Sequence, residues 1–199
     1  MTIHIVSDNA LLLLGVREKI REETVLSKSL ALKTHSPHFS EEDILSDDVV
    51  LICIYSKIIR MNTLERITKL TCNIAIMVQS NFQHKMTSSY PIRVPRKISF
   101  HEIVMLGKRM KRQPPPVRVC NHTYQIFREL YQGESVHSVV AKKQLNLTTI
   151  YNLKKRVFKR FGLKNINDKG VIHCMEYLEI NRLARESLGQ MPGYELRRA

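Results

Sequence analysis

Residues 154–164 contain the densest group of side chains able to bind a polyanion. This stretch holds six lysines and arginines and no acidic residue. Apolar residues recur through it at steps of three or four, at Ile150, Leu153, Val157 and Phe161. This spacing predicts a helix with one buried stripe and a basic outer face. A short helix of that kind has the shape and charge to enter the major groove of DNA.

A second, shorter helix is predicted just before the basic one, over residues 135–143. Ser135 is expected to cap its first turn, because a serine oxygen accepts hydrogen bonds from the free N–H groups there. Residues 144–147 then form a turn, and Asn146 or Thr148 caps the basic helix. The region from Gly133 to Gly162 is therefore interpreted as a helix-turn-helix.

This region resembles the helix-turn-helix of the LuxR/FixJ class of bacterial transcription regulators. The matching residues are Gln132-Gly133, Thr149-Ile150 and Arg160-Phe161-Gly162, with no gap between the two glycines. The pattern departs from the family where polar residues 121–124, Val140 and Leu153 replace the usual types. The resemblance covers about residues 117–183.

The resemblance implies that Thr149, Tyr151, Asn152 and Lys155 face the groove. Tyr151 and Asn152 are expected to read bases, because both carry hydrogen-bonding groups. Cations along the helix are expected to contact phosphates. The predicted DNA-binding residues are Thr148, Thr149, Tyr151, Asn152, Lys154, Lys155, Lys159 and Arg160. The alternative interpretation is a surface helix whose charges are only solvated.

The resemblance also implies that the last helix, predicted over residues 169–183, pairs two DNA-binding domains. Its candidate contacts are Val171, Ile172, Met175 and Leu178. The partner would be a second copy of the chain or another response regulator.

The net charge of +14 also favours a polyanionic partner such as double-stranded DNA. Residues 1–113 carry 17 basic and 11 acidic side chains, whereas residues 114–199 carry 15 and 7. The excess is thus +6 in the first segment and +8 in the shorter second one. Apolar runs are too short to cross a membrane and the four cysteines are far apart, so a cytoplasmic protein with reduced thiols is expected.

Strand-like and helix-like segments alternate before residue 114, which predicts an α/β domain with a parallel sheet. The expected strands are 2–6, 29–34, 49–55, 73–78 and 91–94. The expected helices are 10–23, a short acidic helix after Ser40, 62–70 and 100–112. Three prolines at 114–116 predict an extended linker with few contacts across it. The predicted units are residues 1–113, a linker over 114–118, an all-α four-helix domain over 119–186 containing the helix-turn-helix, and a tail over 187–199.

The first unit resembles a response-regulator receiver with a flavodoxin-like parallel sheet. Such a domain needs an acidic pair for Mg²⁺, an aspartate that accepts the phosphoryl group, a hydroxyl and a lysine. Here Asp8 follows Ser7, Cys53 stands at the phosphoacceptor position and Val94 at the lysine position. The hydroxyl position falls near Val78 or Gln79, with Ser80 one residue on. We therefore expect a pseudo-receiver that takes no phosphoryl group.

These observations together predict a bacterial DNA-binding transcription regulator that acts without aspartate phosphorylation. Genes for surface structures such as fimbriae or capsule are the targets that the resemblance suggests. The alternative is an auxiliary protein that binds and modulates another response regulator. No catalytic site, cofactor or metal site is expected, since no histidine or cysteine pair has ligand spacing joined to a third ligand.

Overall fold

The computed structural model describes residues 1–22, 30–70, 72–78, 90–110, 115–163 and 167–189. Five strands of these residues form one parallel sheet: β1 (Thr2–Ser7), β2 (Ala31–His35), β3 (Val49–Cys53), β4 (Asn73–Val78) and β5 (Ile92–Pro95). Their order is β2-β1-β3-β4-β5, and all neighbouring pairs are parallel. This is the strand order of flavodoxin-like folds, so the predicted fold class is confirmed.

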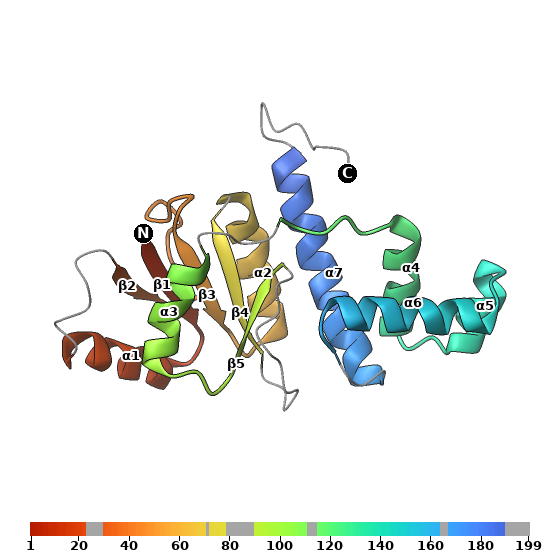
Figure 1. The fold of residues 1–199 in the computed structure, drawn as a ribbon, viewed down its shortest axis with the longest axis horizontal. Coiled ribbons are helices and arrows are strands. Elements are labelled where there is room, and N and C mark those ends of the chain that lie inside the picture. Colours follow the sequence, from red (N-terminus) through yellow and green to blue (C-terminus); the bar gives the residue numbers. More distant parts are fainter. Residues whose placement is uncertain (23–29, 71, 79–89, 111–114, 164–166, 190–199) are drawn as a thin grey trace.

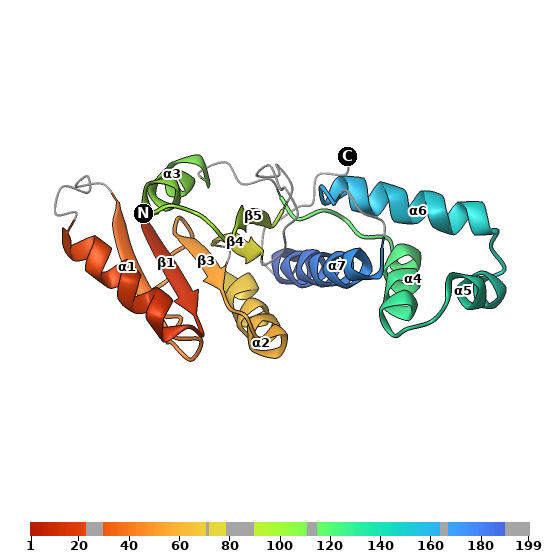
Figure 2. The same cartoon turned by 90° about the horizontal axis from the view of Figure 1, so that it is seen from below.

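Helices cover both faces of the sheet. They are α1 (Ala10–Glu22), α2 (Lys57–Ile67), the 3₁₀ turn η1 (Thr68–Leu70) and α3 (Phe100–Met110). Val16 of α1 and Ile103 of α3 pack with Ile5 and Leu51 on one face, whereas Leu64 of α2 packs on the other. Figure 2 shows α3 and α2 on opposite sides of the strands. Every residue of β3 is therefore buried, as its unbroken apolar run predicts.

The acidic helix expected after Ser40 is absent from residues 36–48, which form turns and bends instead. Four-residue turns replace the helical bonds: Ile44 N–H donates to Glu41 O at 3.0 Å, and Asp48 N–H donates to Leu45 O at 3.0 Å. The carboxylate of Asp48 accepts in turn from Leu45 N–H at 3.1 Å. An aspartate that bonds nearby backbone offers the chain an alternative to the helix, which explains the wrong prediction.

Four helices follow residue 120: α4 (Asn121–Tyr131), α5 (Val136–Lys143), α6 (Leu147–Arg160) and α7 (Asp168–Gly189). Ile126, Val139 and Ile150, one from each of the first three, are fully buried together. Ser135 caps α5 as predicted, accepting from Ser138 N–H at 3.1 Å. The expected all-α arrangement of four helices is thus present.

Helix α7 joins the helical unit to the sheet. Figure 1 shows it between the strands and α4–α6. One continuous apolar cluster includes Ile52 and Ile76 of the sheet together with Phe161 and Tyr177. Arg93 of β5 is fully buried, with its guanidinium 4.9 Å from the ring centre of Tyr177. The expectation that few contacts join the two segments is therefore wrong.

Polar contacts strengthen the same joint. Arg60 of α2 pairs with Glu176 of α7, and their side chains are only 13 % and 6 % exposed. Asn181 of α7 donates to Tyr90 O at 3.1 Å and accepts from Val117 N–H at 2.7 Å. The fully buried Asn181 thus connects α7 to the linker and to the segment just before β5.

Candidate nucleic-acid interface

The turn between α5 and α6 sets the direction of the basic helix. Gln144 takes the left-handed conformation (φ 52°, ψ 40°), and Leu145 N–H donates to Val140 O at 3.2 Å. A left-handed residue at this point ends α5 and turns the chain sharply. Glycine would adopt it more readily, so its presence at Gln144 was not predicted from the sequence.

Asn146 is the N-cap of α6, and its side-chain oxygen accepts two hydrogen bonds from the first turn. Asn146 Oδ1 accepts from the N–H and from the hydroxyl of Thr149, each at 2.7 Å. This decides between the two caps that the sequence left open, in favour of Asn146. Because its proton is already donated, the Thr149 hydroxyl offers only its lone pairs to a ligand.

The outer face of α6 has the composition that the sequence predicts. Tyr151 is 49 % exposed, and Asn152, Lys155 and Lys159 are also exposed. Thr148, Thr149 and Arg160 are exposed as well. Within the described part of the chain, neither Lys155 nor Lys159 forms an ion pair with an acidic side chain. The face therefore presents free cations around two hydrogen-bonding side chains.

Lys154 does not belong to this face, and its predicted surface position is wrong. Its side chain is 5 % exposed, as part of the buried side of α6 with Ile150 and Val157. Position 154 is one helical turn after Ile150, so it follows the apolar stripe rather than the basic face. Burial raises the pKa of the Cys174 thiol on α7, and the charges of Arg93 and then Lys154 partly oppose that rise. Lys164 lies outside the described residues.

The face of α7 expected to pair two subunits is largely used within the chain. Val171 and Leu178 are each 3 % exposed and belong to the cluster shared with the sheet. Ile172 is 43 % exposed, and Met175 packs partly buried against the same cluster. A second copy cannot reach Val171 or Leu178 in this arrangement.

The edge of the sheet where a receiver holds its phosphoryl group is occupied by structural hydrogen bonds. Both carboxylate oxygens of Asp8 accept from Tyr55 N–H at 3.0 Å, and one also accepts from Ser56 N–H at 3.0 Å. Ser7 donates its hydroxyl to Cys53 O at 2.9 Å. Asp8 therefore fixes the loop after β3, which explains why this strand ends at Cys53 rather than at Tyr55.

Cys53 at this edge is an inert thiol. It is 3 % exposed, and burial, followed by the charge of Asp8, raises its pKa to about 12. The thiol is therefore protonated at neutral pH. Val94 at the lysine position is fully buried, whereas Gln79 and Ser80 lie outside the described residues. One engaged carboxylate and a neutral thiol do not make a Mg²⁺ site.

Two of the scattered histidines meet in space, which the sequence did not predict. His4 Nδ1 lies 3.0 Å from His35 Nε2, and His4 Nε2 lies 3.3 Å from Asp48 Oδ2. Burial lowers the pKa of both histidines. No group of three or more His, Cys, Asp or Glu side chains among the described residues is placed to hold a metal ion. None of the described helices is long and apolar enough to span a bilayer.

No protein-family model and no curated protein matches the sequence. Among solved structures, the chain is similar to two RcsB dimers bound to two parallel DNAs (13 % identity, TM-score 0.48) and to the two-component response regulator RcsB–DNA complex (15 %, 0.47). It is also similar to RcsB from Salmonella enterica serovar Typhimurium bound to promoter P1flhDC in the presence of the phosphomimetic BeF₃⁻ (13 %, 0.49). Each alignment covers 90 % of this chain and 98 % of the other. Similarities at this level do not assign the chain to a family.

Proposed function

We propose that this protein is a bacterial transcription regulator of the LuxR-type helix-turn-helix class, which places α6 in the major groove of DNA. The observation that carries the proposal is the outer face of α6, where Tyr151 and Asn152 stand among cations without acidic partners in the described chain. In the groove, Tyr151 and Asn152 would contact base edges, and Lys155, Lys159 and Arg160 would contact phosphates. Thr148 and Thr149 would lie at the groove entrance.

In this proposal the receiver-like unit, residues 1–113, works by protein contact and not by phosphorylation. The bonds of Asp8 and the buried thiol of Cys53 support this, because Asp8 is engaged by the loop after β3 and a protonated thiol cannot accept a phosphoryl group as an aspartate does. The linker at 114–118, the helical domain at 119–186 and the tail at 187–199 complete the proposed division. We further propose that the protein acts in the cytoplasm on genes for surface structures such as fimbriae or capsule. It would bind as a homodimer or as a heterodimer with another response regulator.

A second candidate is an auxiliary protein that modulates another response regulator. The observation that favours it is the apolar surface of α1, where Leu11 is 79 % exposed and Leu14 is 55 % exposed. Exposed leucines of this kind on a surface helix are typical of a protein-contact surface.

Titration of the purified chain against promoter and random DNA separates the two candidates. Binding by the chain alone, with preference for one promoter, supports the regulator. Binding that occurs only when a second regulator is added supports the auxiliary role. A genome-wide footprint would supply the promoter fragments.

A further inference from the structure

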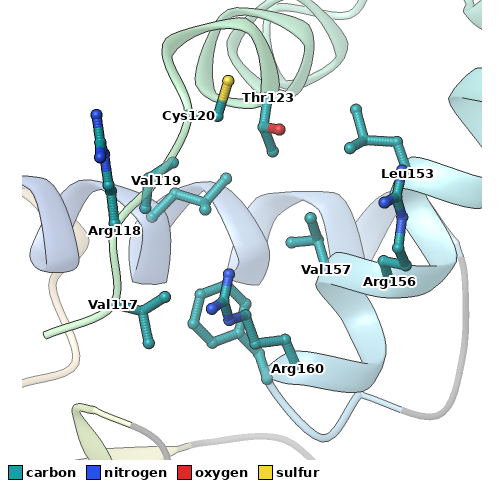
Figure 3. Close-up of a pocket in the computed structure, with 11 residues that line it drawn as sticks. Val117, Arg118, Val119, Cys120, Thr123, Leu153, Arg156, Val157 and Arg160 are labelled. Carbon is teal, nitrogen blue, oxygen red and sulfur yellow. The ribbon is translucent and has the colours of Figure 1, made fainter. Parts of the chain in front are cut away.

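A basic cleft lies between the linker and one flank of α6. Its volume is about 190 Å³, and Figure 3 shows Arg118 on the extended linker segment across from Arg156 and Arg160 on the helix. Val119, Val157 and Phe161 supply an apolar floor. No acidic side chain is found among the described residues that line the cleft. It therefore attracts an anion that also has an apolar or sugar-like surface.

The three arginines of the cleft are available to a ligand. All three are exposed, and none forms a hydrogen bond or ion pair with another described residue. Some arginines elsewhere in the chain are paired with carboxylates, as Arg60 is with Glu176 and Arg182 is with Glu179. Three like charges around one hollow repel each other, and a bound anion would relieve that repulsion.

The position of the cleft on α6 identifies the anion. Successive residues of a helix are about 100° apart, so Lys155 and Lys159 lie at the centre of the outer face and Arg156 and Arg160 lie on the flank toward the linker. A helix nearly fills the 12 Å width of the major groove, so its flanks meet the phosphate walls. Tyr151, on the opposite flank, supplies no cation.

We infer that this cleft holds the phosphodiester backbone of the DNA strand beside α6, and that Arg118 of the linker is part of the DNA interface. The inference rests on the proposed function and extends it to a partner site that lies outside the helix-turn-helix. Arginine suits this role because its planar guanidinium can donate two parallel hydrogen bonds to phosphate oxygens.

The linker backbone is held ready for this contact. Val117 N–H donates to the buried Asn181 at 2.7 Å, and Arg185 donates to Pro116 O at 3.5 Å. Arg118 therefore extends from backbone that is fixed on both preceding residues, so binding loses little backbone entropy. Because Asn181 also bonds Tyr90 O, the same residue connects the cleft to the sheet.

The first test measures the salt dependence of DNA binding by the full chain. Arg118→Gln and Arg156→Gln should each reduce the slope of log affinity against log salt by about one, and the double variant by about two. The loss should be equal on promoter and random DNA, since phosphate contacts carry no sequence information. Arg118→Lys should keep the slope, because a lysine can still neutralise the phosphate.

Lys108→Gln is the matched control, because it removes the same charge from an exposed residue of α3, which lies on the sheet with α7 between it and α6 (Figures 1 and 2). If the wild type binds DNA in a salt-dependent way but the slope is unchanged in both arginine variants, the cleft does not bind the DNA backbone, and the proposed function is unaffected. Absence of any salt-dependent DNA binding by the wild type removes both.

The second test needs no substitution. Cys120 lines the cleft and is exposed, whereas Cys53, Cys72 and Cys174 are buried. DNA in the cleft should therefore protect Cys120 of the native chain from alkylation by a small thiol reagent. Equal alkylation with saturating DNA and without it would place the DNA strand elsewhere.

Discussion

The carboxyl edge of the sheet and the outer face of α6 both carry groups that could bind phosphate or a metal, yet they differ in what those groups already contact. At the sheet edge, Asp8 holds two backbone N–H groups and Ser7 holds the carbonyl of Cys53. On α6, Lys155 and Lys159 face solvent without an acidic partner among the described residues. The side chains of the sheet edge are therefore structural because they already have hydrogen-bond partners, whereas the cations of α6 remain available to a ligand.

The two regions also differ in which elements support them. Asp8 joins the turn after β1 to the loop after β3, so its bonds hold two strands in position. The outer face of α6 is organised by its own cap and by the apolar side of the same helix. Losing a ligand contact on α6 therefore leaves the fold intact, whereas losing a bond at the sheet edge loosens a loop.

The largest expected effect comes from breaking the joint that supports both regions. Tyr177→Ala should lower the free energy of unfolding by about 3–5 kcal/mol, because this ring is 1 % exposed and covers Arg93 and Phe161. Urea denaturation gives the change. Ile172→Ala on the same helix, where the side chain is 43 % exposed, should cost much less. Equal losses in the two variants would mean that α7 does not join two parts of one core.

A second prediction compares two adjacent lysines of α6. Lys155→Ala should weaken DNA binding and reduce the salt slope by about one, since one phosphate contact is lost. Lys154→Met should leave the slope unchanged, because the side chain is 5 % exposed and methionine keeps its apolar stem buried. Fluorescence anisotropy at several salt concentrations measures both. A slope reduced equally by Lys154→Met would refute the assignment of that lysine to the buried side.

The third prediction separates the regions by pH. Burial lowers the pKa of His4 and His35, so the unfolded chain binds more protons between the folded values and about 6.5. The contribution of the two neutral histidines to the free energy of unfolding is therefore fully present above pH 6.5, and it should fall as the pH drops below that value. Asp48, Lys33, Asp43 and Arg17 are the charged groups around the pair.

Urea midpoints at pH 7.5 and 5.5 measure this dependence. His35→Gln should make this pH dependence shallower, because one of the two histidines that bind a proton on unfolding is removed. The same pH dependence in wild type and variant would show that another histidine, such as the half-buried His173, is responsible.

The smallest expected effect is that of a phosphodonor, which should change neither the protein nor its DNA binding. A small phosphodonor with Mg²⁺ should leave the protein unmodified and its DNA affinity constant, because Cys53 is a buried neutral thiol and Asp8 is engaged. Intact-protein mass spectrometry and a DNA titration test this. An acyl phosphate on any residue of the sheet edge would erase the difference between the two regions.

Local features of this protein could be predicted from its sequence. The strands, the cap at Ser135 and the basic face of α6 all follow from residue type and spacing. These features depend on neighbours within a few residues, where side-chain direction is set by the helix or strand itself. The error at Lys154 arose because its charge was given more weight than its position one turn after Ile150.

The tertiary structure alone decided which distant residues meet. The contact of His4 with His35 and Asp48, the burial of Arg93 under Tyr177, and the cleft between Arg118 and Arg156 all join residues far apart in the chain. Nothing in the local pattern of α7 separates a helix that pairs with a second subunit from one that packs on its own sheet. Both bury the same apolar stripe, and only the positions of the surrounding elements determine which partner covers it.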